Sequence, residues 1–121
     1  MRISIIIPAH NEENHLSLCL DSFVGQTHQP DELIVVDDNS QDITFQIAQT
    51  YAKKHPWISA LQRKSENKHI PGKKVVDTFN FGLNHASDYD LIGKFDADII
   101  LPSHYFEEMH SRFQDNRKLG M

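Results

Sequence analysis

Short apolar runs alternate along this chain with segments whose apolar positions recur every three or four residues. The first run, Ile3 to Ile7, is rich in β-branched residues and is followed by Pro8, which predicts a buried strand that ends there. The next segment has the apolar spacing of one helix face, with Asn11 as its predicted N-cap. That face consists of Leu16, Cys19, Leu20 and Phe23, so we interpret Cys19 as a core residue and not as a nucleophile.

The same alternation continues to the end of the chain. Further strands are predicted at 33–36, 57–61 and 91–95, and the polar residues 62–72, which end in Pro-Gly, are predicted to form a loop. Three more helices are predicted around these strands, the last of them starting near residue 102. Their expected inward residues are Ile43, Ile47, Ala48, Tyr51 and Ala52, then Val76, Phe79, Leu83 and Ala86, and finally Phe106, Met109 and Phe113.

Strands that alternate with helices predict an α/β fold. Connections between parallel strands are right-handed, so we expect a doubly wound, mostly parallel, Rossmann-like sheet with helices on both faces. We expect about four strands in the order 3-2-1-4 and a single domain over residues 1–121. Because the chain ends where a fifth strand would begin, we also expect a truncated fold that continues beyond Met121.

Composition narrows the range of functions. The 121 residues carry a net charge of −5, which gives no global attraction for nucleic acid or for an anionic membrane. A single Cys excludes an internal disulfide, and the longest purely apolar run has three residues, far short of the ~20 that a membrane helix needs. We therefore expect a cytoplasmic protein, placed at the inner face of a membrane by segments outside this sequence.

Carboxylates recur where the predicted strands end. Glu12 follows the first strand, Asp37 and Asp38 end the second, and Asp96 and Asp98 follow the fourth. Ligands of open parallel sheets bind outside the carboxyl ends of the strands, so we expect these side chains to face one crevice. Carboxylates that repel one another need a cation, a proton or donor-rich ligand groups among them, and oxygen-only ligands favour a hard divalent ion such as Mg²⁺ or Mn²⁺.

Each acidic pattern also has an ordinary structural explanation. Asp-Asp-Asn-Ser after a strand is commonly a turn with a helix cap, and a lone Asp-x-Asp is frequent. Their conjunction at one sheet edge favours a binding site. The turn at 8–13 has no glycine and is acidic, which argues against a dinucleotide or P-loop site.

Several segments together resemble family 2 glycosyltransferases of the GT-A fold. They are the run from Ile5 to Glu13 (Ile-Ile-Ile-Pro-Ala-His-Asn-Glu-Glu), Leu20-Asp-Ser-Phe, Gln26-Thr27, the stretch from Glu32 to Asp42, and Phe95-Asp-Ala-Asp98. The last of these is similar to the family's Asp-x-Asp metal motif. The resemblance implies an enzyme that transfers a sugar, with inversion, from a nucleoside-diphosphate sugar of the UDP or GDP type.

The resemblance also implies roles for individual residues. Asp38 would accept a hydrogen bond from the base, Asp96 would lie beside the ribose and the metal, and Asp98 would ligate the metal. Lys73 and Lys74 would help to hold the diphosphate, although two lysines at the start of a helix are more often solvated surface residues. The implied nucleotide-binding residues are Pro8, Ala9, His10, Asn11, Glu12, Asp38, Lys74 and Asp96, and the implied metal ligands are Asp98 and Asp96.

The catalytic base is expected beyond Met121, because relatives continue past the Asp-x-Asp. Glu107 and Glu108 fall in the first turn of a predicted helix, where they suit the helix dipole. We therefore interpret the chain as a donor-binding half that is inactive in transfer alone, with a glycan or lipid-linked acceptor bound elsewhere. The open sheet edge and apolar helix faces predict a homodimer.

Two other functions share parts of this pattern. A phosphatase of the haloacid-dehalogenase type uses Asp-x-Asp, but after the first strand of the chain. A receiver domain has a similar length, but it carries a phospho-acceptor Asp after the third strand, where this chain has Gln62-Arg63-Lys64. Both alternatives are weaker than the glycosyltransferase interpretation.

Overall fold

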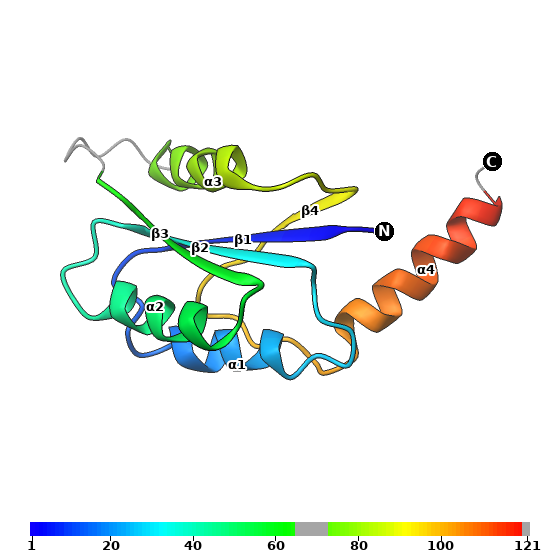
Figure 1. The fold of residues 1–121 in the computed structure, drawn as a ribbon, viewed down its shortest axis with the longest axis horizontal. Coiled ribbons are helices and arrows are strands. Elements are labelled where there is room, and N and C mark those ends of the chain that lie inside the picture. The colour runs from blue at the N-terminus through cyan, green and yellow to red at the C-terminus, as the bar shows by residue number, and fades with distance from the viewer. Residues whose placement is uncertain (65–72, 120–121) are drawn as a thin grey trace.

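The computed structural model describes residues 1–64 and 73–119, and in this part of the chain strands alternate with helices (Figure 1). The expected loop at 62–72 lies mostly outside the described residues. The elements are β1 (Ile3–Ala9), α1 (Leu16–Val24), β2 (Glu32–Asp38), α2 (Thr44–Lys54), β3 (Ile58–Arg63), α3 (Lys73–His85), β4 (Leu91–Lys94) and α4 (Tyr105–Leu119).

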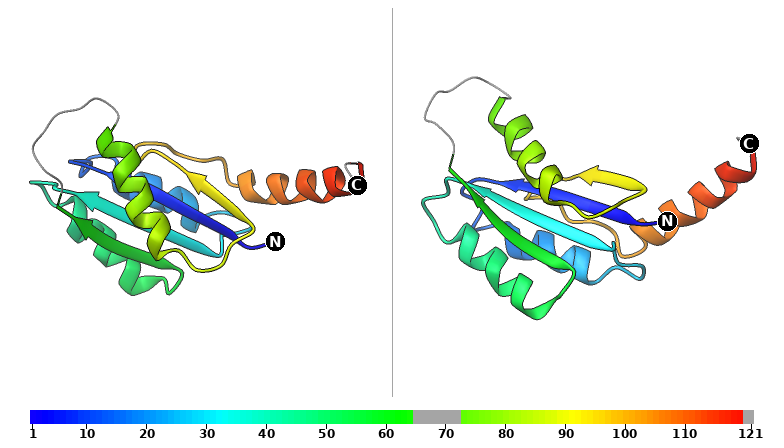
Figure 2. Two further views of the ribbon diagram at one scale, coloured as in Figure 1. Left: turned by 90° about the horizontal axis from the view of Figure 1, so that it is seen from above. Right: turned by 45° about the horizontal axis from the view of Figure 1, so that its top comes forward.

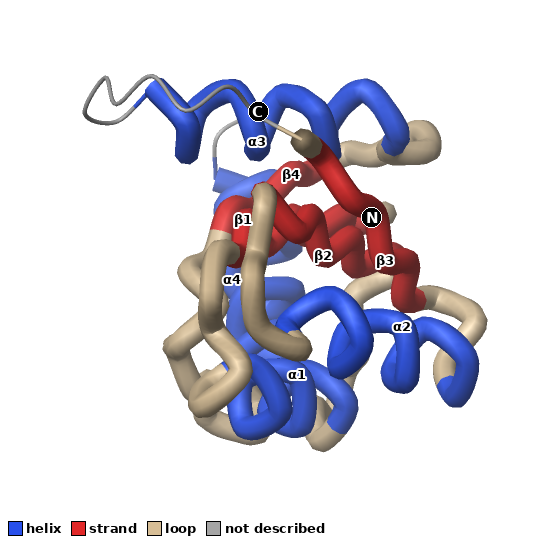
Figure 3. Tube along the Cα trace, turned by 90° about the vertical axis from the view of Figure 1, so that its left-hand side faces the viewer, coloured by secondary structure: helices blue, strands red, loops and turns tan. Residues whose placement is uncertain are grey.

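The described strands form one parallel sheet in the order β3-β2-β1-β4, which confirms the predicted order. The end-on view of Figure 3 shows the sheet between α3 on one face and α1 with α2 on the other. Helix α4 extends away from this body in both views of Figure 2. The two-sided covering is the doubly wound arrangement expected from the alternation of elements.

The central strands send alternate residues into two apolar layers. Ile5 and Val35 pack with α1 and α2, whereas Ile6 and Val36 pack with α3. Both layers are buried because helices cover both faces, so β1 and β2 are almost continuously apolar. The sheet thereby holds the carboxyl ends of β1, β2 and β4 in fixed register.

Pro8 does not end the first strand, contrary to the sequence prediction. Strand β1 continues to Ala9, with Pro8 paired opposite Val36. The carbonyl of Ile6 accepts a hydrogen bond from Phe95 N, so the even-numbered residues of β1 direct their backbone N–H and C=O groups toward β4. Because β4 ends at Lys94, a residue at position 8 needs no N–H on that side, and proline is tolerated.

Other local predictions were also wrong. Asn11 is not the N-cap, because α1 begins one turn later, with the carbonyl of Glu12 accepting from Leu16 N at 2.9 Å. Ile43 and Val76 were expected to face inward but are exposed, and so is much of Phe113. Ile43 is the N-cap residue of α2 and Val76 is the fourth residue of α3, and at such positions the apolar periodicity of the sequence does not show whether another element covers the side chain.

At Gly82, α3 packs tightly against the sheet. A Cβ added there would lie 2.8 Å from the Cγ2 methyls of both Ile6 and Val36, which are buried and β-branched. We predict that Gly82→Ala lowers the free energy of unfolding by about 1–3 kcal/mol through overpacking, although alanine favours a helix. Urea denaturation followed by circular dichroism measures this loss.

The matched control for Gly82→Ala is Asn84→Ala, at an exposed position of the same helix. This change should leave the unfolding free energy unchanged or slightly raised, because alanine is the better helix former. A Gly82→Ala protein as stable as wild type would show that α3 can move away from the sheet at no cost.

Candidate functional site

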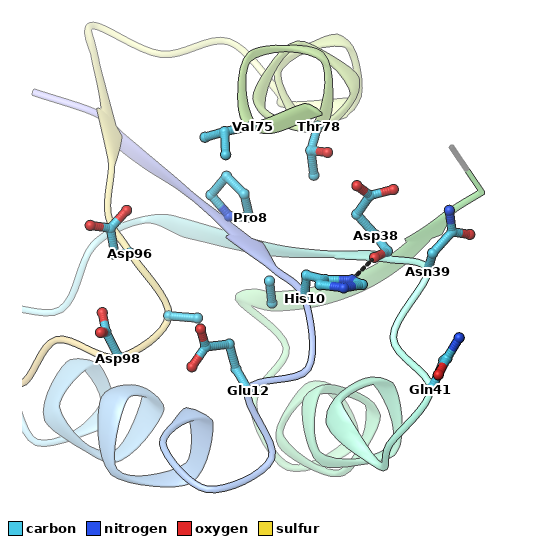
Figure 4. Close-up of a pocket in the computed structure, with 12 residues that line it drawn as sticks. Pro8, His10, Glu12, Asp38, Asn39, Gln41, Val75, Thr78, Asp96 and Asp98 are labelled. Atoms are coloured by element: carbon cyan, nitrogen blue, oxygen red, sulfur yellow. Dashed lines mark hydrogen bonds between the residues drawn. The ribbon is translucent and has the colours of Figure 1, made fainter. Parts of the chain in front are cut away.

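A pocket of about 540 Å³ opens where β1, β2 and β4 end (Figure 4). Its walls come from the segments that follow these strands and from the start of α3. In Figure 4 the carboxylates of Glu12, Asp96 and Asp98 gather at one end, and Asp38 and Asn39 lie at the other. The residues that line the pocket are Pro8, Ala9, His10, Glu12, Asp38, Asn39, Gln41, Val75, Thr78, Asp96, Ala97 and Asp98.

The loop after β1 and the loop after β2 are joined by reciprocal hydrogen bonds. Side chains of each loop bond to backbone amides of the other, so neither loop can move alone. The bonds run from Asn11 N to Ser40 Oγ (2.9 Å), Gln41 N to Asn11 Oδ1 (2.8 Å), Glu12 N to Thr44 Oγ1 (2.8 Å), Glu13 N to Asp42 Oδ2 (3.2 Å) and Ile43 N to Glu13 Oε2 (3.3 Å).

Asp42 shows the effect of this network on a side chain. Burial acts to raise the pKa of Asp42, but hydrogen bonds from the hydroxyl and amide of Thr44 and from the amide of Glu13 outweigh it and lower the pKa below its usual value. The Asp42 carboxylate therefore stays ionised and holds the start of α2 against the loop that follows β1.

His10 lines the pocket and links the same two loops. Its Nδ1 lies 2.6 Å from the carbonyl oxygen of Asp38. A carbonyl only accepts, so Nδ1 carries the hydrogen, and Nε2 accepts from the Asn11 amide at 3.2 Å. Asn11 and Asn39 both adopt positive φ, 52° and 56°, which asparagine tolerates better than most residues. These turns place His10 between the two ends of the pocket.

At one end of the pocket, Arg63 holds the Asp38 carboxylate. Arg63 Nη1 donates to Asp38 Oδ1 at 3.4 Å and to Thr78 Oγ1 at 3.2 Å, and Nη2 lies 3.8 Å from Asp77 Oδ2. Asp38 is nearly buried, with a guanidinium on one oxygen. Its carboxylate is therefore a fixed hydrogen-bond acceptor on the pocket wall.

At the other end, three carboxylates share one acidic region. Burial, together with the negative charges of Asp98 and Glu12, raises the pKa of the Cys19 thiol to about 12, so both carboxylates act on the same buried atom. Cys19 Sγ lies 3.7 Å from the carbonyl oxygen of Asp96. Cys19 is fully buried, which confirms it as a core residue.

The donor set at this end fits a hard divalent cation. Glu12, Asp96 and Asp98 supply only carboxylate oxygens, the ligands that Mg²⁺ and Mn²⁺ prefer. Among the described residues, no three His, Cys, Asp or Glu side chains are close enough to hold a metal ion by themselves.

Asp37 does not face the pocket, contrary to expectation. Adjacent strand residues point to opposite faces, so Asp38 faces the pocket while Asp37 is buried on the side of α1 and α2. Both of its carboxylate oxygens lack a hydrogen-bond partner among the described residues. The acidic pair at the end of β2 thus contributes one carboxylate to the site.

Most of the predicted site residues meet at the pocket. Asn11 lies outside its lining and instead holds the loop that follows β2. Lys73 and Lys74 begin α3, and their side chains lie outside the described part. Glu107 and Glu108 belong to the first turn of α4 and do not line the pocket. The predicted residues that do line it are Pro8, Ala9, His10, Glu12, Asp38, Asp96 and Asp98.

The sequence analysis missed contributions from β3 and α3. Arg63 was assigned to the loop after the third strand, but it is the last residue of β3 and pairs with Asp38. Val75 and Thr78 reach the pocket from the first turns of α3. The sequence did contain a signal for the Arg63–Asp38 pair, because Arg63 comes at the end of the third strand and Asp38 at the end of the second, at the same edge of the sheet.

Comparisons with known proteins identify the family and similar folds. The profile of glycosyl transferase family 2 matches residues 4–120. A poly(ribitol-phosphate) beta-glucosyltransferase of Bacillus spizizenii is 43% identical over 65 residues, which are 52% of this chain and 10% of that protein.

Two solved structures are similar over most of the chain. S. aureus TarS 1-349 in complex with UDP has a TM-score of 0.75 and 25% identity, over 95% of this chain and 32% of that one. The mannosyltransferase PcManGT from Pyrobaculum calidifontis, in complex with GDP-Man and Mn²⁺, has a TM-score of 0.66 and 29% identity, over 84% of this chain and 28% of that one. The chain thus spans between about a tenth and a third of the length of these relatives.

Neither alternative function is supported. The Asp-x-Asp follows β4 and not the first strand, and β3 ends in Arg63 where a receiver domain has its phospho-acceptor aspartate. Separately, no helix within residues 1–64 and 73–119 has the length and apolar character needed to cross a membrane.

Proposed function

This chain belongs to glycosyl transferase family 2 and has the GT-A fold, and from this we propose that it binds the nucleoside-diphosphate sugar and a divalent metal of a glycosyltransferase. The observation that carries the proposal is the pocket itself. It has a single fixed carboxylate acceptor at one end and a group of carboxylates at the other, as Figure 4 shows. A nucleoside diphosphate has matching parts, a base with N–H donors and a diphosphate that binds metal.

Asp38 would receive the base. Uracil and guanine both carry a ring N–H, and a carboxylate accepts such a donor. Arg63 occupies one oxygen of Asp38 and keeps the side chain in place, which leaves the other oxygen for the ligand. The likeness to structures that contain UDP or GDP-Man supports a base of this type.

Asp98 and Asp96 would hold the metal, Mg²⁺ or Mn²⁺, with Glu12 adding negative charge to the same end. When bound, the ion would offset the charge of the departing nucleoside diphosphate. The protein's own contribution is to hold these carboxylates in fixed positions: Ala97 between them is buried, and the Asp96 carbonyl contacts Cys19.

The acceptor site and the catalytic base are proposed to lie in the rest of a longer protein. Inversion requires a base that removes the proton of the acceptor hydroxyl, and Glu107 and Glu108 do not line the pocket. Within the described part, β4 pairs on one side only, with β1, and an apolar groove lies between β4 and α4. Further strands could be added at this edge. The glycan or lipid-linked acceptor and the homodimer stay predictions.

Calorimetric titration with UDP, GDP and CDP, with and without Mn²⁺, tests the proposed function. We expect UDP or GDP to bind at least about tenfold more tightly with Mn²⁺ than without it, and more tightly than CDP, because cytosine lacks the ring N–H that Asp38 would accept. Equal affinity for all three nucleotides would contradict the role of Asp38. Absence of nucleotide binding under every condition would contradict the proposal as a whole.

A further inference from the structure

Gln26 joins the end of α1 to a distant segment of the chain. It follows the C-cap residue Gly25 and is only 6% exposed. Its Nε2 donates to the carbonyl of Ser22 at 3.0 Å and to the carbonyl of Pro102 at 2.7 Å. Its Oε1 accepts from Phe106 N at 3.2 Å. Both N–H groups and the oxygen of this buried amide are therefore used.

The segment that Gln26 holds leads from the acidic end of the pocket to α4. Residues 95–104 contain no helix or strand, so no regular backbone pattern fixes their path. At the pocket end, the segment is held by Phe95, which packs edge-on against Phe23 at 5.5 Å between ring centroids, and by the contact of Cys19 with the Asp96 carbonyl. At the far end it is held by Gln26 and by Thr27, whose N–H donates to Ser103 O at 2.9 Å.

Side-chain contacts do little to fix the orientation of the Asp96 carboxylate. The Asp96 side chain is 72% exposed, and its ion pair with Lys94 is long, at 3.6 Å. Exposed ion pairs of this kind contribute little. The direction of Asp96 and Asp98 thus depends on where the backbone of the segment runs.

We propose that Gln26 is a positioning residue for Asp96 and Asp98, acting through the Pro102–Phe106 end of their segment. The inference rests on the proposed function, because it assumes that these carboxylates hold a divalent cation. Groups that orient metal ligands typically change metal affinity by 10- to 100-fold when they are removed. Gln26 acts at a distance through the backbone, so its loss should lie at the lower limit of that range.

Gln26→Met is the variant that tests the proposal, because it keeps the length and the buried apolar stem but removes all three hydrogen bonds. Gln29→Met is the matched control. Gln29 is an exposed glutamine at the same end of α1, and it donates only to Val24 O, at 2.8 Å, among the bonds described. Gln26→Glu is the second variant if the first does not fold, because it keeps the size and the oxygen that accepts from Phe106 N but removes both N–H donors.

Amide hydrogen exchange without ligand is the first measurement. Residues 97–106 should exchange about tenfold faster in Gln26→Met than in wild type, with β1 and β2 unchanged, because a local opening becomes easier. The second measurement is the affinity for Mn²⁺ in the presence of UDP or GDP, which should fall about tenfold. The affinity for the nucleotide without metal should stay the same, because Asp38 lies at the other end of the pocket.

A positioning role and a general structural role give different results. Unchanged exchange and unchanged Mn²⁺ affinity in Gln26→Met would overturn the proposal, and so would an equal loss in Gln29→Met. An equal fall of nucleotide affinity with and without metal would also overturn it, because it would mean that the whole pocket had moved. If wild type shows no Mn²⁺-dependent nucleotide binding, the proposed function fails, and the proposed role of Gln26 toward a metal fails with it. The exchange comparison then still decides whether Gln26 holds the segment.

Discussion

Asp98→Asn is expected to weaken the Mn²⁺-dependent part of UDP or GDP binding by about 100-fold, or about 2.7 kcal/mol. Asparagine keeps the shape of the side chain but removes the negative charge, and hard divalent cations bind carboxylates far better than amides. Asp98 lines the pocket in the same acidic region as Glu12, so the loss should concern the metal and not the base. Calorimetric titration of the nucleotide at several Mn²⁺ concentrations measures it.

The matched control for Asp98→Asn is Asp88→Asn, which makes the same change of charge at an exposed position between α3 and β4. It does not line the pocket, so the Mn²⁺-dependent affinity should stay within about twofold of wild type, because salt screens exposed charges that do not contact the ligand. Equal losses in both variants would show that net charge, and not ligation by Asp98, governs binding. Nucleotide affinity without metal should be the same in all three proteins.

Phe106→Ala is expected to lower the free energy of unfolding by about 3–5 kcal/mol. The side chain is fully buried, and its ring contacts those of Phe23, Phe95 and Tyr105 with centroids 5.9, 6.3 and 5.1 Å apart. Removing the ring takes apolar surface out of this cluster and leaves a cavity that rigid neighbours fill poorly. Because small domains are stable by only about 5–15 kcal/mol, urea denaturation should show a large shift of the midpoint.

Phe113→Ala tests whether the loss comes from the aromatic cluster or from α4 itself. Phe113 lies two turns further along the same helix and is 42% exposed. Its replacement should cost less than about 1 kcal/mol, since partly exposed positions contribute less burial. If the two variants lost the same stability, packing of Phe106 against Phe23 and Phe95 would not be what holds α4 to the body.

Local patterns were sufficient to predict the elements and their order in the sheet. Apolar runs such as Ile3–Ile7 and the helical spacing from Leu16 to Phe23 reflect burial directly. The period of a strand or helix determines which of its residues face the core. The position of Asp38 and of Asp96 directly after apolar runs also predicted the edge at which the pocket forms. In a parallel sheet this edge is shared by all strands, so strand ends far apart in sequence are brought together.

The sequence by itself thus determined the α/β class, the strand order and the acidic edge, since these depend on periodicity and on strand direction. Only the tertiary structure decided which carboxylates reach the pocket. One face of β2 is covered by α1 and α2, which buries Asp37, whereas on the other face Asp38 lies beside Arg63. It also decided the roles of Asn11 and Gln26, which bond to residues 30 and 76–80 positions away. Contacts at such separations leave no periodic signal, because they depend on where folding places two segments and not on the residues next to either one.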